Sequence, residues 1–246
     1  MTGSASRRLG AASAGFAGMF AAIQWVPSVV SLGQWLPVRS LPSGWCSWRG
    51  RSGTTVALTF DDGPDPATTP RILDALDRLG LVATFFCTGA HVERHPGLAC
   101  ELRDRGHAVG SHGYAHEHHL LHGPGWIARD LDAALRVSAA AGLSPRWYRP
   151  PYGQCSGPTL FAARRRGLST VLWSAWGREW AAPDAGAVAA RVGAALAPGA
   201  VVLLHDSDAF SPPGSVERTL VALESVAADL ADRGLRAATL DEVMAE

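Results

Sequence analysis

The sequence VALTFDDGP, residues 56–64, combines a short run of mainly apolar residues with two adjacent carboxylates and a Gly-Pro pair. A short apolar run that ends in turn residues is typical of a buried β-strand. Thr69 and Pro70 can then begin a helix as N-cap and first-turn residue, and Gly80 can end it. This stretch predicts a strand, a loop with Asp61 and Asp62, and a helix that crosses back.

The same alternation of strand and helix continues along the chain from about residue 54. The expected strands cover residues 56–60, 82–87, 107–110, 147–149, 169–173, 200–204 and 236–240, and the later helices cover 96–105, 125–141, 158–166, 185–196 and 215–233. Parallel sheets with crossover helices have this pattern. We therefore predict an α/β fold, a distorted parallel (β/α) barrel of about seven strands. An open doubly wound sheet is the alternative.

An apolar N-terminal segment precedes this domain. Residues 9–38 contain no charged side chain and follow Arg7 and Arg8, which is typical of an export signal or a membrane anchor. We interpret residues 1–38 as that segment, residues 39–53 as a linker and residues 54–246 as the folded domain. The domain is then extracytoplasmic, either membrane-anchored or secreted. An apolar helical arm packed on the domain is the alternative.

The composition excludes several functions. The 22 basic and 22 acidic residues give a formal net charge of zero, so no broad electrostatic field would attract nucleic acid. Every basic residue is Arg, which excludes a phosphate-loop lysine and a Schiff-base lysine. The four cysteines, Cys46, Cys87, Cys100 and Cys155, lack the short spacings of zinc ribbons and redox motifs. Cys87 lies in an apolar run, where we expect a buried thiol.

Polar residues follow the expected strands, where the loops of a parallel barrel carry function. They are Asp61 and Asp62 after the first strand, His112 and His116 after the third, Arg149 at the fourth, residues 173–180 after the fifth, and His205 with Asp206 after the sixth. Residues with unrelated structural roles would have no reason to share one rim. We expect these side chains to meet there.

Asp62, His112 and His116 are the predicted metal ligands. The two histidines are four residues apart, so both imidazoles can point to one place. Adjacent carboxylates repel each other and need a cation or an Arg to stay ionised. Two His and one Asp leave coordination positions open, which suits zinc or another divalent first-row ion with a bound water.

Each of these residues also has a structural alternative when taken alone. Asp61 and Asp62 could cap backbone amides in a turn, and His205 could be a hydrogen-bonded core residue at the end of its apolar strand. His112 and His116 could be polar loop residues. We interpret their neighbours Glu117, His118 and His119 as solvated loop residues, with a histidine-rich metal sink as the alternative.

Four short motifs occur in one order: TFDDGP at 59–64, HGYAH at 112–116, RPPYG at 149–153 and LLHD at 203–206. Together they resemble the polysaccharide deacetylase family, the NodB homology domain of carbohydrate esterase family 4, over about residues 54–241. The resemblance implies a distorted barrel that removes acetyl groups from N-acetylglucosamine units of peptidoglycan, chitin or similar glycans.

The resemblance also implies a role for each motif residue. Asp61 matches the general base, His205 the general acid and Arg149 the residue that orients the base. Tyr152 matches the residue whose backbone amide supports the oxyanion. The remaining matches are the metal ligands Asp62, His112 and His116. Zinc is usual in the family, and cobalt or another divalent ion can substitute.

Two positions depart from the family pattern. Gly113 stands where the family usually has Ser or Thr, so it offers no hydroxyl to brace the loop or a ligand. The family motif Asp-x-x-Asp-Trp reads WGREW at residues 176–180, and Trp176 replaces the first Asp, which tunes the acid histidine. Glu179 is a candidate to take over that role. Trp180 keeps an apolar wall for a sugar or an acetyl methyl.

The expected function is metal-dependent removal of N-acetyl groups from a glycan partner, with membrane contact through residues 1–38. One alternative keeps the site and changes the substrate to a non-sugar amide, a formamide or an O-acetyl ester. Another is an inactive glycan-binding module, which the altered motif at 176–180 favours. A structural metal site fits less well, because three protein ligands leave the coordination open.

Overall fold

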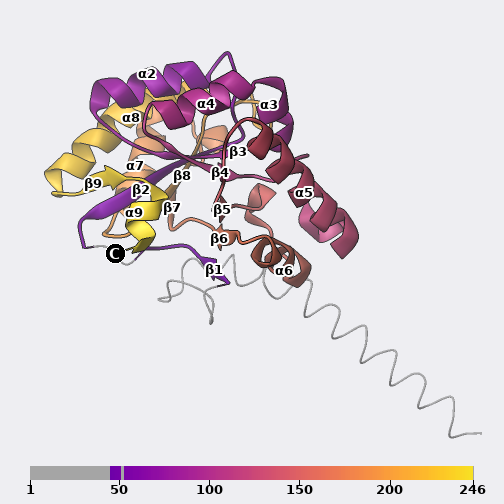
Figure 1. The fold of residues 1–246 in the computed structure, drawn as a ribbon. Helices are drawn as coiled ribbons and strands as arrows, with labels where there is room; N and C mark the ends of the chain where they lie inside the picture. Colours follow the sequence, from indigo (N-terminus) through magenta and orange to yellow (C-terminus); the bar gives the residue numbers. More distant parts are fainter. Residues whose placement is uncertain (1–44, 51–52, 246) are drawn as a thin grey trace, which may run out of the picture.

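The computed structural model describes residues 45–50 and 53–245 (Figure 1). The expected signal or anchor segment at residues 1–38 lies outside this part of the chain, as does most of the expected linker. Within the described residues, no helix is both long enough and apolar enough to cross a bilayer.

One parallel sheet organises the described domain. Its strands are β1 (Cys46–Ser47), β2 (Thr55–Asp61), β3 (Thr84–Cys87), β4 (Ala108–Ser111), β5 (Trp147–Tyr148), β6 (Ser169–Val171), β7 (Ala175–Trp176), β8 (Val201–His205) and β9 (Arg236–Ala238). They pair in the order β1-β6-β5-β4-β3-β2-β8-β7, and β9 pairs with the beginning of β2. β2 therefore pairs with three strands, β3, β8 and β9, and its buried apolar residues form part of the core.

The connection between β6 and β7 shows that this sheet is curved. β6 is second and β7 eighth in the strand order, yet only the three residues 172–174 connect them. In a flat sheet, strands six positions apart would be roughly 29 Å from each other. Three connecting residues span at most about 15 Å. The sheet must therefore curve so that its two ends approach each other, and the predicted distorted parallel barrel is confirmed.

Helices lie outside the curved sheet (Figure 1). They are α2 (Thr69–Leu79), α3 (Gly89–Arg94), α4 (Pro96–Asp104), α5 (Pro124–Ala140), α6 (Gly157–Arg165), α7 (Ala185–Ala195), α8 (Ser215–Asp232) and α9 (Leu240–Ala245), with 3₁₀ turns η2 (His119–Leu121), η3 (Pro151–Gly153) and η4 (Glu179–Ala181). Pro70 lies in the first turn of α2, and Gly80 ends the helix with φ 64°. All six expected helices are present, whereas α3 and α9, which are short and carry too little periodicity, were not predicted.

Two short strands were also not predicted. β1 lies within residues 39–53, the range interpreted as a linker, and it pairs with β6 through Cys46 and Thr170. Cys46 and Trp48 are buried in the core, so this piece of the chain is packed on the barrel. β7 pairs with β8 after the expected fifth strand has ended at Val171. The expected burial of Cys87 is confirmed.

Candidate functional site

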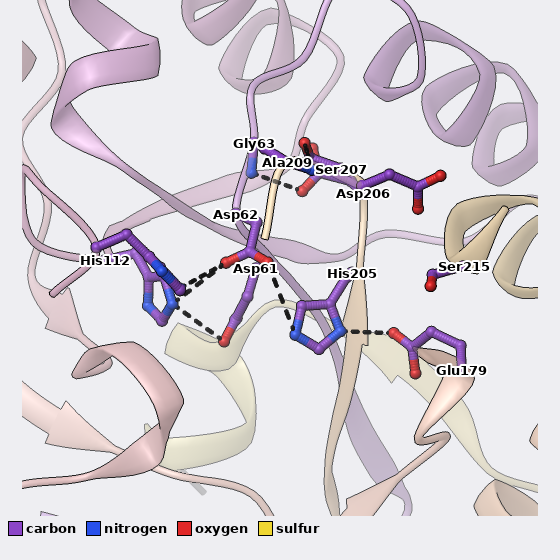
Figure 2. Close-up of polar contacts among 12 residues, drawn as sticks. Asp61, Asp62, Gly63, His112, Glu179, His205, Asp206, Ser207, Ala209 and Ser215 are labelled. Carbon is purple, nitrogen blue, oxygen red and sulfur yellow. Dashed lines mark hydrogen bonds and ion pairs between the residues drawn. The ribbon is translucent and has the colours of Figure 1, made fainter. Parts of the chain in front are cut away.

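The polar residues that follow the strands converge on one pocket at the rim of the barrel. Asp61 and Asp62 come from the end of β2, His112 and His116 follow β4, and His205 ends β8. All five line a pocket of about 270 Å³. Figure 2 shows Asp62 between His112 on one side and His205 on the other.

Asp62, His112 and His116 form a compact set of potential metal ligands. The Nε2 atom of His116 lies 3.1 Å from Oδ1 of Asp62, and Nε2 of His112 lies 3.5 Å from the same oxygen. One ligand atom from each of the three residues lies within 4.8 Å of the others. All three side chains are buried. These residues are therefore close enough to share one ion.

The hydrogen bonding around the three residues also suits a cation. Nδ1 of His112 lies 2.8 Å from the carbonyl oxygen of Arg149 and donates to it, which leaves the lone pair of Nε2 facing Asp62. Oδ1 of Asp62 is buried and has no hydrogen-bond partner among the described residues. A buried carboxylate oxygen without a partner is costly. A divalent ion between the two imidazoles would satisfy it.

The electrostatic environment favours the charge states that metal ligands need. Burial alone would raise the pKa of Asp62, but the short contact with the His116 imidazole and the positive charge of His205 lower it to about 2. Burial lowers the pKa of His112 to about 4. An ionised carboxylate and a neutral imidazole at neutral pH are the forms that bind metal ions.

Asp61 is fixed by a buried arginine. Nη1 of Arg149 donates to Oδ1 of Asp61 at 2.7 Å and to Oγ1 of Thr59 at 2.8 Å. The guanidinium also donates to the backbone carbonyls of Val171 and Leu172, and Arg149 is 0% exposed. This network leaves the second oxygen of Asp61 directed toward His112, at 3.8 Å from its Nε2.

His205 has its own carboxylate partner. Nδ1 of His205 lies 2.6 Å from Oε1 of Glu179, which is fully buried in η4 (Figure 2). Burial lowers the pKa of His205, but the charge and hydrogen bond of Glu179 outweigh this effect and raise it to about 10. Nε2, on the other side of the ring, lies 4.0 Å from Oδ2 of Asp62. The imidazole is thus held in its protonated form at the pocket wall.

Glu179, the candidate that the sequence offered in place of the missing Asp, is therefore the carboxylate in contact with His205. Trp176 contributes an aromatic side chain to the pocket wall instead of a carboxylate. Trp180 also lines the pocket and meets the His205 ring edge to face, with centroids 5.3 Å apart. The walls are mainly aromatic, which suits a sugar ring or an acetyl methyl.

Tyr152 and Phe210 line the pocket beside His116. Tyr152 has φ 59°, in the left-handed region, and its side chain is half exposed. Phe210 stacks on the His116 ring with centroids 3.8 Å apart. Phe210 follows β8 by only five residues, but a single aromatic in an irregular loop gave no sequence signal for this contact.

Asp206 supports the loop that carries Asp61 and Asp62, a role that we did not predict. Its Oδ1 accepts the Gly63 N–H at 3.0 Å, and its Oδ2 accepts the Thr69 hydroxyl at 2.5 Å. Its place in the LLHD motif, directly after a strand, was the feature of the sequence that could have indicated this role.

The expectation of a solvated His119 is wrong. Its side chain is 0% exposed, and Nδ1 lies 3.2 Å from the Tyr148 hydroxyl. The η2 turn carries His119 inward toward β5 and α6, where Thr159 also meets it. His118, in contrast, stacks on Tyr152 with centroids 3.7 Å apart. Because both residues are histidines, their polarity alone could not show which of the two is buried.

Comparisons with known proteins agree with this geometry. The family model for polysaccharide deacetylase matches residues 49–171. A chitooligosaccharide deacetylase from Bradyrhizobium sp. (strain ANU 289) is 39% identical over 166 residues, which cover 66% of this chain and 74% of that protein.

Solved structures agree as well. A peptidoglycan N-acetylglucosamine deacetylase superposes with a TM-score of 0.78 at 29% identity, over 86% of this chain and 98% of that one. A CE4 family pseudoenzyme from Bacillus anthracis gives a TM-score of 0.73 at 26% identity, over 82% of this chain and 69% of that one. The family match and the identity to the Bradyrhizobium protein show that this chain belongs to the polysaccharide deacetylase family.

Proposed function

We propose that this protein hydrolyses the N-acetyl groups of N-acetylglucosamine-containing glycans, peptidoglycan or chitin-like, and releases acetate. The observation that carries the proposal is that Asp61 lies beside His112, and His205 beside Asp62, in the pocket that the three candidate metal ligands line. A base and an acid that flank a metal site are the groups that amide hydrolysis needs.

Asp62, His112 and His116 would hold a divalent cation, with zinc favoured and cobalt as the alternative. When bound, such an ion polarises a carbonyl and brings the pKa of a water to about 7. Asp61 would then take the proton of that water. The ion pair with Arg149 fixes the rotamer of Asp61, which supports its assignment as base.

His205 would give its proton to the leaving amine. At neutral pH the imidazolium form dominates, because Glu179 raises the pKa of His205 to about 10. General acid catalysis of this kind is typically worth about a hundredfold to ten-thousandfold in rate. The Nε2 atom faces the pocket while Nδ1 is held by Glu179, so one orientation of the ring serves both functions.

The backbone amide of Tyr152 would support the developing oxyanion, and Trp180 would contact the sugar or the acetyl methyl. A preorganised backbone donor in a site that excludes water stabilises a tetrahedral oxyanion effectively. The left-handed conformation of Tyr152 is consistent with a backbone held in place for function. The pocket of about 270 Å³ is slightly below the usual range for small-molecule sites, so it suits one substituted sugar of a longer chain.

The proposed location follows from the substrate and from the apolar residues 9–38. Peptidoglycan and chitin-like polymers lie outside the cytoplasm, and a segment without charges is suited to export or anchoring. We therefore propose an extracytoplasmic enzyme, secreted or membrane-anchored.

Acetate release from peptidoglycan and from N-acetylated chitin oligomers tests the proposal. We expect a chelator to stop release and added zinc or cobalt to restore it. Asp61→Asn should retain metal and lose turnover, whereas His112→Ala should lose both. An Asp61→Asn protein that releases acetate at the wild-type rate would contradict the assignment of the base.

The inactive glycan-binding module is the second candidate, favoured by the likeness to a pseudoenzyme and by Trp176. It predicts that the metal-loaded protein binds glycan oligomers without releasing acetate. Release of acetate from any of these glycans would eliminate it. Formate release, or acetate release only from esters or small amides, would redirect the assignment to those substrates.

A further inference from the structure

The loop of residues 112–116, which we call the histidine loop, is hydrogen-bonded at its middle to the carboxylate of Asp130 from α5. The Tyr114 N–H donates to Oδ2 of Asp130 at 2.9 Å, and the Ala115 N–H donates to Oδ1 at 2.9 Å. Asp130 is buried, with 7% of its surface exposed. Both of its oxygens are thus committed to the two backbone amides that lie between His112 and His116.

The carbonyl groups of the same loop are held from the other side. The Gly89 N–H donates to the Gly113 oxygen at 2.8 Å, and the Ala90 N–H donates to the Tyr114 oxygen at 3.1 Å. These donors belong to the first residues of α3. The backbone of α3 and the side chain of Asp130 thus both hold the middle of the loop.

Two residues of the histidine loop have left-handed backbone conformations. Gly113 has φ 75° and His116 has φ 52°. A residue with a Cβ is strained in this region unless the surroundings enforce it. The hydrogen bonds of Asp130 lie between these two positions, where they oppose relaxation of the loop.

Gly113 makes room for this carboxylate. A Cβ at position 113 would lie 2.8 Å from Oδ2 of Asp130, too close for an unshifted carboxylate. The hydroxyl that the family resemblance leads us to expect at this position is absent. Asp130 lies against the same part of the loop and supplies two acceptors to it.

A second buried residue lies behind Asp130. Nε2 of His119 is 3.9 Å from Oδ2 of Asp130, and Nδ1 is 3.2 Å from the Tyr148 hydroxyl. With Tyr148 donating to Nδ1, the proton of His119 resides on Nε2 and faces the carboxylate. His119 is thus buried beside Asp130, with Tyr148 and Thr159 as the partners of its Nδ1.

We infer that Asp130 is a positioning residue for the metal ligands His112 and His116, and that it takes over the support that a side chain at position 113 cannot give. The inference rests on the proposed metal-dependent function, since it concerns the geometry of the same ligands. Asp130 touches neither ligand side chain and acts through the backbone between them.

Metal affinity and the visible spectrum of the cobalt-loaded protein test the inference without relying on turnover. Asp130→Asn keeps the shape but leaves one acceptor, and its NH₂ group would face a backbone N–H. We expect zinc affinity, measured by competition with a chromophoric chelator, to fall about 10–100-fold. The cobalt spectrum should change because the imidazoles are no longer fixed.

Asp132→Asn is the matched control. Asp132 lies on the same helix, but its carboxylate is exposed and pairs with Arg166. We expect its zinc affinity and cobalt spectrum to equal those of the wild type. Gly113→Ala is a second test, because it leaves the charge of Asp130 in place and pushes a methyl against it; it should also weaken zinc binding. This variant keeps the inference testable if Asp130→Asn does not fold.

The outcomes distinguish a failure of the proposed function from a failure of the role inferred for Asp130. A wild-type protein that does not bind zinc or cobalt through Asp62 would contradict the proposed function itself. A wild type that binds zinc while Asp130→Asn or Gly113→Ala binds it equally tightly, with an unchanged cobalt spectrum, would overturn the role of Asp130. Equal loss in Asp130→Asn and Asp132→Asn would overturn it too.

Discussion

Oε1 of Glu179 lies 2.6 Å from Nδ1 of His205, so the carboxylate partner of the proposed acid comes from η4, three residues after Trp176. Glu179 is buried, His205 is partly exposed to the pocket, and the opposite ring nitrogen faces Asp62. Because Glu179 favours the imidazolium form, it sets the pH range in which His205 can act as an acid.

Glu179→Gln should move the alkaline limit of activity to lower pH. The variant removes the negative charge that raises the pKa of His205 to about 10, so this pKa should fall by about 1–3 units. The protonated acid then disappears at a lower pH than in the wild type. The pH profile of kcat measures this shift.

Glu224→Gln is the control for this experiment, because Glu224 is exposed and pairs with Arg78 on the surface. Its pH profile should match that of the wild type. An alkaline limit that is the same in Glu179→Gln and in the wild type would contradict the role of Glu179.

Arg149→Met should destabilise the protein and reduce turnover together. The buried carboxylate of Asp61 would lose its cation, and breaking a buried ion pair by removing one partner typically costs about 3–5 kcal/mol. Denaturant unfolding gives the change in stability. Arg71→Met is the control, since its pair with Glu217 is exposed and should contribute less than about 1 kcal/mol. A similarly small loss of unfolding free energy in both variants would show that Arg149 does not hold Asp61.

The barrel and the grouping of Asp62 with the histidines could be predicted, because both follow from short local patterns in the sequence. Each strand is a short apolar run, and Asp62, His112 and His205 follow three of these runs at the end where parallel strands meet. A pattern of this kind can be recognised in the sequence without knowing how the helices and strands pack. The two-residue strand β1 carries no such pattern and depends on its pairing with β6.

The supporting contacts could not be predicted, because each joins residues far apart in sequence. Asp130 reaches the histidine loop from the middle of α5, and Phe210 reaches His116 from an irregular loop. Whether His119 is buried depends on how η2 packs against α6. Such contacts are decided by the relative placement of elements, which residue type and spacing do not determine.

Tyr152→Phe should retain most of the activity. The proposed role of Tyr152 lies in its backbone amide, and its side chain is half exposed beside His118. We therefore expect kcat on a chitin oligomer to stay within about threefold of the wild type, against the hundredfold or larger loss typical of a missing oxyanion donor. A loss of that larger size would assign the chemistry to the phenol hydroxyl instead.

Gly63→Ala should weaken both metal binding and the fold, because the loop after β2 has no room for a methyl. An added Cβ would lie 2.0 Å from Oδ2 of Asp206, whose two oxygens already accept from Gly63 and Thr69. Displacing this buried carboxylate shifts the loop that carries Asp62. We expect unfolding free energy to fall by about 1–3 kcal/mol and zinc affinity about 10–100-fold.

Gly97→Ala supplies the matched control for Gly63→Ala, since a Cβ at Gly97 in α4 meets nothing within 4 Å. It should leave zinc affinity unchanged and stability equal or slightly higher, because Ala favours a helix over Gly. In an Asp206→Ala background the methyl at position 63 gains space, so the further loss caused by Gly63→Ala should be smaller than in the wild type. Fully additive losses would mean that the two side chains do not compete for the same space, and that the loop is held by something other than Asp206.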